Sequence, residues 1–244
     1  MNTSRTVVIT GTSSGIGLGL AKAYLELGYN VVGNARTEQR LQEAAEQLGN
    51  SARFIGVAGD IAEPDTAKRL FQAAIEAFGQ VDILINNAGI FQAKPFTDYT
   101  VEDLDTQIGT NLKGFVYPSQ VAAAHMIPRK QGFIINITAS VALQPNQQVP
   151  ATVPVLIKGG INQATRALAL ELAPYNIKVN AVAPGIVDTP MHSPENREFL
   201  KTLQPLGRVA NISEITDAVL YLTSADFTTG VVLAVDGGMS SGKW

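Results

Sequence analysis

The sequence predicts a single doubly wound α/β domain, with a seven-stranded parallel sheet and helices on both of its faces. Short apolar runs rich in β-branched residues alternate along the 244 residues with longer segments of helical period. Several short runs are apolar nearly throughout, as in Val81–Ile85 and Gly132–Ile135, which is typical of strands that helices cover on both faces. Because 45% of the residues are hydrophobic and 16% charged, the chain has enough core to exclude disorder as its main state.

Seven runs are expected to be strands, and each consecutive pair is separated by a segment long enough for a helical crossover. In chain order the expected strands are Thr6–Thr10, Asn30–Ala35, Arg53–Ala58, Val81–Asn86, Phe133–Thr138, Ile177–Val182 and Val231–Val235. The chain has no internal repeat, low-complexity tract or linker rich in Pro, Gly and Ser. We therefore expect residues 1–244 to form one domain.

The helical segments between these strands have recognisable ends. Three of them stop immediately before a glycine, the residue that a helix C-terminus favours in the left-handed conformation. These are Ile16–Leu27 before Gly28, Glu38–Leu48 before Gly49, and Pro64–Phe78 before Gly79. Three further helices are expected, from about Asn111 to Met126, Val155 to Ala173 and Ser213 to Leu222.

Charge and composition exclude several classes of function. With 18 basic and 21 acidic residues the net charge is −3, so the chain lacks the basic footprint of a nucleic-acid-binding protein. Because it has no cysteine and two histidines, we expect no disulfide and no metal site. The short polar stretch Met1–Thr6 does not resemble a signal peptide, and no apolar stretch is long enough to span a bilayer. We expect a cytoplasmic protein that does not bind membranes.

The strongest local motif joins the first strand to the first helix and reads Thr-Gly-Thr-Ser-Ser-Gly-Ile-Gly over residues 10–17. Gly11 permits a tight turn, Gly15 lets backbone amides approach a pyrophosphate, and Gly17 allows close packing of a helix whose N-terminus favours an anion. No Gly-Lys-Ser/Thr follows, so the loop is not of the nucleoside-triphosphate type. The motif indicates the dinucleotide site of a Rossmann fold; the alternative is a tight turn without a ligand.

The end of the second strand indicates which dinucleotide is preferred. An NAD-specific site places an acidic residue there, whereas this chain has Arg36 after Asn34 and Ala35. An arginine can pair with a 2′-phosphate, and no carboxylate is available to hold a 2′-hydroxyl. The sequence therefore favours NADP(H) over NAD(H). The alternative is that Arg36 is a surface residue capping the next helix.

The order of motifs along the chain resembles that of the short-chain dehydrogenase/reductase family from about Thr6 to Gly238. The glycine loop is followed by Gly59–Ile61, Asn86–Gly89, Thr110–Leu112, Lys158, Asn180–Gly185, Thr228–Gly230 and Val235–Gly238. The resemblance implies that the cofactor is held by Gly11, Ser13, Ser14, Gly15, Ile16 and Gly17 in the loop, by Arg36, by Asp60 and Ile61 at the adenine, by Asn87, Ala88 and Gly89 at the ribose, by Lys158 at the nicotinamide ribose, and by Pro184, Gly185 and Thr189 at the nicotinamide.

The resemblance also implies hydride transfer between the nicotinamide and a carbonyl or alcohol carbon. In the family a tyrosine exchanges the proton, a lysine lowers the pKa of that tyrosine, and a serine holds the substrate oxygen. The tyrosine stands four residues before the lysine, and that position is Pro154 here. No tyrosine occurs between Tyr117 and Tyr175. The chain is thus similar to the family but diverges from it by lacking the usual active-site tyrosine.

Three residues remain as catalytic candidates, namely Lys158, Asn111 and Ser140. Ser140 lies near the usual serine position, with Thr138 as the next candidate, and Asn111 can hold a helix irregularity and a water near the lysine. Pro154 fits the first turn of a helix, so the fold tolerates it. Thr152 is expected to be the N-cap of that helix, the alternative being a catalytic role.

Residues 189–206 stand where the family carries its mobile substrate lid. His192 in this segment either faces solvent or replaces the missing proton donor, since an imidazole titrates near neutral pH. His125 is expected to be structural. Family members are commonly oligomers, so we expect a homodimer or homotetramer in which Trp244 is partly buried.

Two functions follow from these observations. The first is an NADP(H)-dependent oxidoreductase that interconverts a carbonyl and an alcohol on a small-molecule substrate with a non-standard proton donor. The second is an NADP(H)-binding protein without that reaction. A third, dehydration or isomerisation in the same pocket, also stays open.

Overall fold

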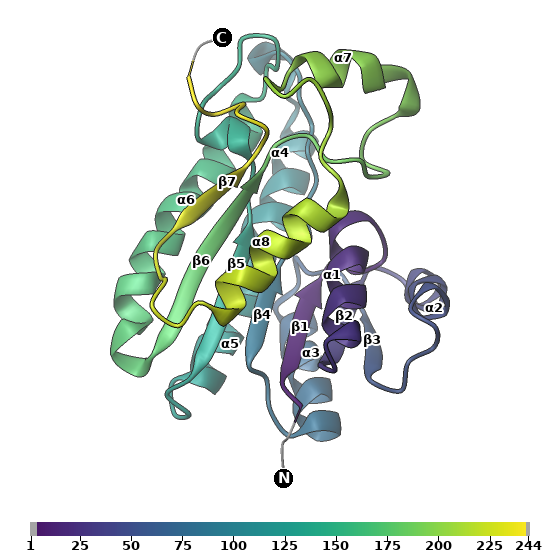
Figure 1. The fold of residues 1–244 in the computed structure, drawn as a ribbon, viewed down its shortest axis with the longest axis vertical. Helices are drawn as coiled ribbons and strands as arrows, with labels where there is room; N and C mark the ends of the chain where they lie inside the picture. Colours follow the sequence, from purple (N-terminus) through teal and green to yellow (C-terminus); the bar gives the residue numbers. More distant parts are fainter. Residues whose placement is uncertain (1–3, 243–244) are drawn as a thin grey trace.

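The computed structural model describes residues 4–242 and contains one sheet of seven parallel strands (Figure 1). The strands lie in the order β3-β2-β1-β4-β5-β6-β7, so the chain reverses its direction of travel across the sheet after β3. Their bounds are β1 Thr6–Thr10, β2 Asn30–Ala35, β3 Phe54–Ala58, β4 Ile83–Asn86, β5 Gly132–Ile137, β6 Ile177–Pro184 and β7 Val232–Val235. The predicted doubly wound fold is confirmed. The expected burial of Trp244 lies outside the described residues.

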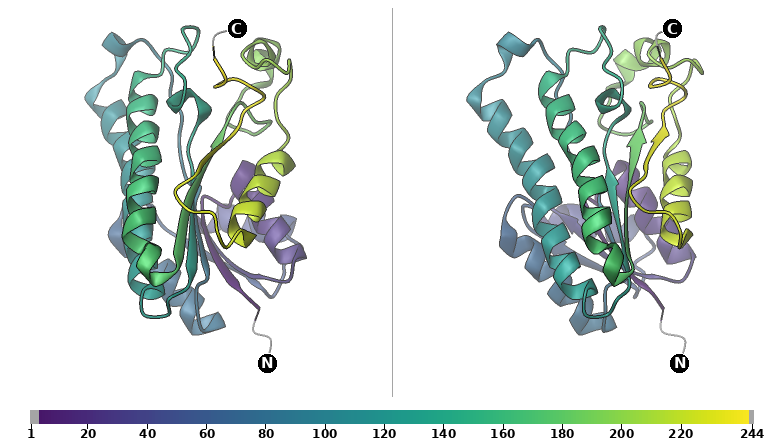
Figure 2. Two further views of the ribbon diagram at one scale, coloured as in Figure 1. Left: turned by 60° about the vertical axis from the view of Figure 1, so that its left-hand side comes forward. Right: turned by 90° about the vertical axis from the view of Figure 1, so that its left-hand side faces the viewer.

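Helices cover both faces of the sheet (Figure 2). Their bounds are α1 Gly15–Glu26, α2 Glu38–Gln47, α3 Pro64–Phe78, α4 Val101–Gln107, α5 Gly114–Met126, α6 Thr152–Leu172, α7 Arg197–Thr202 and α8 Ile212–Ser224. Side chains of α1 and α8 pack on one face, and side chains of α3, α5 and α6 pack on the other. Because successive strand residues point to opposite faces, Val7 and Ile9 of β1 join the first of these cores, whereas Val8 joins the second.

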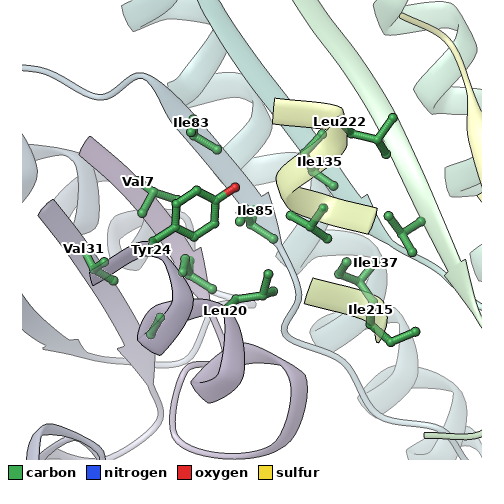
Figure 3. Close-up of a cluster of buried hydrophobic side chains, with 14 of the residues drawn as sticks. Val7, Leu20, Tyr24, Val31, Ile83, Ile85, Ile135, Ile137, Ile215 and Leu222 are labelled. Atoms are coloured by element: carbon green, nitrogen blue, oxygen red, sulfur yellow. The ribbon is translucent and has the colours of Figure 1, made fainter. Parts of the chain in front are cut away.

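Tyr24 links the two helices of the first face. Its ring lies among Val7, Ile85 and Leu20 (Figure 3), and its hydroxyl is 2.8 Å from Oγ1 of Thr223 on α8. Burial raises the pKa of Tyr24, so the phenol stays neutral and serves as a structural hydrogen-bonding group.

Most element boundaries agree with the sequence. β1, β2 and α3 have the predicted bounds, and Gly28, Gly49 and Gly79 all have φ between +71° and +85°, as expected for glycines that end helices. Two short helices, α4 and α7, were not predicted. The predicted N-cap Thr152 is wrong, since α6 is capped by Ala151 and Thr152 is its first residue.

The helix expected from Asn111 starts instead at Gly114. The six residues before it, Ile108–Lys113, form a π-helical segment that connects α4 to α5. Such segments arise where an extra residue is inserted into an α-helix, and they occur frequently at functional sites. Asn111 therefore does lie in a helix irregularity.

A polar cluster joins the amino-terminal ends of β1 and β4 to the end of α5. Asp82 accepts hydrogen bonds from the Thr6 amide at 2.9 Å and from Arg129 at 2.7 Å. Nε2 of His125 accepts one from the Val81 amide at 3.1 Å. Burial, aided by the charge of Arg129 and opposed by that of Asp82, lowers the pKa of His125. His125 is structural, as predicted.

Replacing His125 with alanine is expected to lower the free energy of unfolding at pH 7 by about 1–3 kcal/mol, because the buried Val81 amide loses its acceptor. For a chain of this length that corresponds to a decrease in Tm of roughly 2–10 °C. Since the folded protein favours neutral His125, the contribution is present above the unfolded-state pKa of about 6.5 and is lost as the pH falls.

Thermal unfolding between pH 5 and 8 measures both effects. His125→Gln is the control, because its side-chain oxygen accepts a hydrogen bond but does not titrate. A Tm difference between wild type and His125→Ala that is independent of pH contradicts the titration argument.

Candidate active site

A cavity of about 650 Å³ opens beyond the carboxyl ends of the strands. These strand ends point toward the top of Figure 1. Residues that follow β1 to β6 line it, so the cavity lies where a parallel sheet whose strand order reverses places its ligand site. Every residue that the sequence assigned to the cofactor lines this one cavity: Gly11, Ser13, Ser14, Gly15, Ile16, Gly17, Arg36, Asp60, Ile61, Asn87, Ala88, Gly89, Lys158, Pro184, Gly185 and Thr189.

The glycine loop is held open by contacts with the loop after β4. A Cβ atom on Gly17 would overlap the carbonyl oxygen of Gly11, so helix α1 approaches the turn as closely as the backbone allows. Nδ2 of Asn87 donates to the carbonyl oxygens of Thr10 at 2.9 Å and Gly11 at 3.1 Å. Oγ1 of Thr10 accepts from the amides of Asn87 and Ala88. This arrangement leaves the start of α1 uncovered and fits a pyrophosphate.

Two arginines line the cavity beside the end of β2. Arg36 was predicted, and Arg40, on the first turn of α2, was not. Thr37, rather than Arg36, caps α2 by accepting from the Arg40 amide. Among residues 4–242, neither guanidinium forms an ion pair with a carboxylate, so both charges are available to a ligand. Asp60, on the neighbouring loop, accepts from the Ala62 amide at 2.9 Å.

Lys158 is buried and lines the cavity. Its Nζ atom donates to the carbonyl oxygen of Ile137 at 2.9 Å, and burial lowers the pKa of Lys158 to about 8. A Cβ atom on Gly89 would lie 3.0 Å from Oδ1 of Asn111 and 3.4 Å from Nζ of Lys158. The amide of Asn111 bonds both the N–H and the carbonyl oxygen of Ile90 at 3.0 Å. The π-helical segment thereby places Asn111 beside Lys158.

A second, much smaller cavity adjoins Lys158 and Asn111, with space of about 10 Å³, enough for about one water molecule. Asn86 and Asn136 also line it. Nδ2 of Asn86 donates to Oγ of Ser119 and to Oδ1 of Asn136, whereas its own Oδ1 has no partner among the described residues. A buried carbonyl oxygen without a donor is a favourable site for a water.

Pro154 occupies the position at which the family resemblance led us to expect a tyrosine. Pro154 is buried in the first turn of α6. The first hydrogen bond of the helix comes from the next residue, Val155, whose amide donates to the Ala151 carbonyl oxygen at 2.9 Å. The missing N–H of Pro154 therefore costs no hydrogen bond of the helix. Among the described residues, no tyrosine lines the cavity, and the titratable side chains that do are Arg36, Arg40, Asp60, Lys158 and His192.

Ser140 and Thr138 both line the cavity beyond β5. Oγ of Ser140 donates to Sδ of Met239 at 3.4 Å, and Oγ1 of Thr138 donates to the carbonyl oxygen of Val182 at 3.3 Å. Ser140 is buried, so a substrate oxygen would have to compete only with a weak sulfur acceptor for its hydroxyl proton. Sequence reasoning missed Met239, which reaches the cavity from the far end of the chain.

The segment 189–206 lies over the same cavity and includes α7. His192 lines the cavity, and burial lowers its pKa, opposed by the charge of Asp188. The imidazole is thus neutral at pH 7. Gln204 holds the end of the segment: it accepts from the Ile186 amide at 3.0 Å and donates to the carbonyl oxygen of Arg208 at 2.6 Å.

Comparisons with known proteins give a consistent result. A family model described as enoyl-(acyl carrier protein) reductase matches residues 11–240. A 3beta-hydroxysteroid dehydrogenase 1 from Eggerthella lenta is 35% identical over an alignment of 248 positions, which covers 97% of this chain and 94% of that protein.

Two solved structures are similar over nearly the whole chain. One is ElxO with NADP bound, with a TM-score of 0.92 and 26% identity over 98% of this chain and 100% of that one. The other is a 3-ketoacyl-(acyl-carrier-protein) reductase from Brucella melitensis complexed with NADH, with a TM-score of 0.90 and 30% identity over 97% of this chain and 98% of that one. Within residues 4–242, no helix has both the length and the apolar character needed to cross a bilayer.

Proposed function

Because the chain belongs to the short-chain dehydrogenase/reductase family, we propose that it is an NADP(H)-dependent oxidoreductase that interconverts a carbonyl and an alcohol through a proton donor other than tyrosine. The main support for this proposal is that the cavity contains a buried amine, that of Lys158, whose pKa burial lowers to about 8. At pH 7 it is mainly protonated, yet it can release its proton within the physiological range.

The cavity residues fit a dinucleotide. The glycine loop offers the uncovered start of α1 to the pyrophosphate, and the pocket beside Gly89 and Lys158 suits the nicotinamide ribose. A bound nicotinamide supplies the hydride that a carbonyl carbon accepts. The chain has to supply the proton for the carbonyl oxygen.

Lys158 is the group that we assign to this proton. The ammonium gives up its bond to Ile137 and protonates the carbonyl oxygen directly or through a water, while the hydroxyl of Ser140 holds that oxygen. The neutral amine then takes up a proton that comes from bulk solvent, with a water in the small cavity between Asn86 and Lys158 as the relay. Carbonyl, hydride and proton together give the alcohol, so the step is balanced.

The preference for NADP(H) is supported by Arg36 and Arg40. Both guanidinium groups line the cavity beside β2, and both are exposed and unpaired among the described residues. A guanidinium binds a phosphate group through charge-assisted hydrogen bonds. These arginines therefore suit the 2′-phosphate that distinguishes NADPH from NADH.

Replacing both Arg36 and Arg40 with alanine is expected to raise Kd for NADPH by about 100-fold or more, since each lost charge-assisted bond is worth about 1.5–3 kcal/mol. Kd for NADH, which has no 2′-phosphate, is expected to change little. Isothermal titration of the two cofactors measures the ratio. Arg166→Ala, which removes an exposed arginine outside the cavity, is the control. A parallel loss of affinity for both cofactors contradicts the assignment.

A second function is favoured by one observation, the lack of a tyrosine among the described residues of the cavity. In this alternative the protein binds NADP(H) and does not reduce carbonyl compounds. NADPH oxidation across a panel of aldehydes and ketones, together with direct measurement of NADPH binding, separates the two. Turnover with any carbonyl compound supports the oxidoreductase. Tight binding without turnover across the panel supports the binding protein.

A further inference from the structure

We infer that the substrate bound beside Lys158 is an uncharged and largely apolar carbonyl compound or alcohol, rather than a sugar, an acid or a phosphate ester. This inference rests on the proposed function, because it concerns the substrate of the same cavity. It follows from two features of the cavity: the apolar side chains that line its walls, and the positions of the charged side chains around it.

Four segments far apart in the sequence bring apolar side chains to this end of the cavity. They are the loop after β4 with Phe91, the loop before α6 with Val149, helix α7 with Phe199, and the C-terminal segment with Met239. Figures 1 and 2 show α7, the loop before α6 and the C-terminal segment together beyond the carboxyl ends of β5 to β7. A bound molecule would contact carbon and sulfur on each of these sides, with Gln148 and Asn196 as the polar side chains among them.

Some of these walls are already buried, whereas others are open to a ligand. Leu203 and Met239 are 2% and 6% exposed, so they form a closed floor. Met191 and Phe199 line the same cavity but remain 57% and 51% exposed. An apolar substrate that covers them removes this surface from water, which favours binding. A polyhydroxylated substrate would gain little from the same contact and would lose hydration.

Two cations on the segments that carry these walls are paired with carboxylates. Lys94, in the loop after β4, is bound to Asp103, and Arg197, on α7, is bound to Asp188. Neither of these two cations lines the cavity. Hydrogen bonds from Lys94 and Thr100 hold the pKa of Asp103 well below its usual range, so this first pair stays ionised and occupied at neutral pH.

The charges that do line the cavity lie elsewhere. Arg36, Arg40 and Asp60 follow β2 and β3, which are on the opposite side of β1 from β5 and β6. In the proposed function Lys158 bonds the reacting oxygen. His192 is mainly neutral at pH 7 because burial lowers its pKa. A substrate carboxylate or phosphate at the apolar end would be desolvated without a counter-charge, which is strongly unfavourable.

A matched set of ketones tests the inference. 2-Octanone and 7-oxooctanoate carry the same methyl ketone and the same chain length, and they differ in a terminal carboxylate; fructose is a neutral but hydroxylated ketone. With NADPH we expect kcat/KM for 2-octanone to exceed that for 7-oxooctanoate by about 10-fold or more, which is about 1.4 kcal/mol. Fructose is expected to be the poorest of the three. Equal values, or a preference for either polar ketone, overturn the inference.

Substitutions at Phe199 connect the preference to the cavity wall. Phe199→Ser is expected to raise KM for 2-octanone about 3-fold or more, because part of the apolar contact is lost. Phe199→Arg places a cation on this wall and is expected to shift the ratio of kcat/KM toward 7-oxooctanoate by about 10-fold. Phe227→Ser is the matched control, because Phe227 is fully exposed and lies outside the cavity. If Phe199→Arg leaves the ratio unchanged, this wall does not select the substrate.

A binding measurement separates this inference from the proposed function. At saturating NADP⁺, the three ketones are compared by the rise in Tm that each one causes. If 2-octanone alone raises Tm but neither the three ketones nor any compound of the wider panel is reduced, the apolar preference stands and the oxidoreductase proposal fails. If 2-octanone is neither reduced nor raises Tm, the inference itself is wrong.

Discussion

Replacing Lys158 with methionine is expected to lower kcat/KM for NADPH-dependent carbonyl reduction by about 10²–10⁴-fold, the usual contribution of a positioned acid or base. Methionine suits the site because Lys158 is buried and a long apolar side chain fills its space without leaving an unpaired charge. The Ile137 carbonyl loses one donor, so the effect on Tm is expected to be small. Initial rates at saturating NADPH measure the loss. Equal turnover by the two proteins contradicts the role of Lys158.

The same group sets the expected pH dependence. Burial lowers the pKa of Lys158 to about 8, so the proton donor is present below that pH and absent above it. Carbonyl reduction is therefore expected to fall as the pH rises through about 8, whereas alcohol oxidation, which needs the neutral amine, is expected to rise. Lys158→Arg is the control, because arginine keeps its proton in this range and removes the inflection. A rate that does not change between pH 7 and 9 points to a different donor.

Replacing Pro154 with tyrosine is expected to raise kcat/KM for carbonyl reduction by about 10²-fold or more. Pro154 lies one helical turn before Lys158 on α6, and residues four apart share a face of the helix. A phenol placed there meets the ammonium of Lys158, which lowers the pKa of the phenol and gives the cavity a second proton donor, one that the ammonium can reprotonate. The first turn of α6 accepts a residue with an N–H, because that group needs no helical partner.

Pro154→Phe is the matched control for this gain. It adds the same ring without the hydroxyl, so it is expected to leave turnover at the wild-type level or below. A gain of equal size in Pro154→Phe assigns the effect to the shape of the pocket. A gain confined to Pro154→Tyr shows that the cavity still aligns a carbonyl group with the cofactor and that proton supply limits the natural protein.

The sequence predicted the sheet and the cofactor end of the cavity because local patterns determine both. Apolar runs such as Val81–Ile85 identify buried strands. The glycines at 11, 15 and 17 have the spacing of a phosphate-binding turn. In a parallel sheet every strand ends at the same edge. Motifs that follow separate strands are therefore brought together without any knowledge of side-chain contacts.

The substrate end could not be predicted in the same way, because it depends on contacts between distant segments. Arg40 lies on an exposed face of α2 and resembles an ordinary surface arginine in the sequence. Met239 meets Ser140 from the C-terminal segment, which no local pattern indicates. Helix α7 has six residues and follows several prolines, so its periodicity was too short to recognise. Thr152 had the residue type of an N-cap, but the backbone placed the cap one residue earlier.

Gln204 joins the two ends of the segment that lies over the cavity. Its buried amide bonds the backbone of both Ile186 and Arg208, so it joins the two ends of the segment between them. The entropic cost of bringing the two ends of this loop together is therefore part of the free energy of folding. We therefore expect any movement of residues 189–203 during substrate exchange to require only local ordering, because the ends of the segment are already joined.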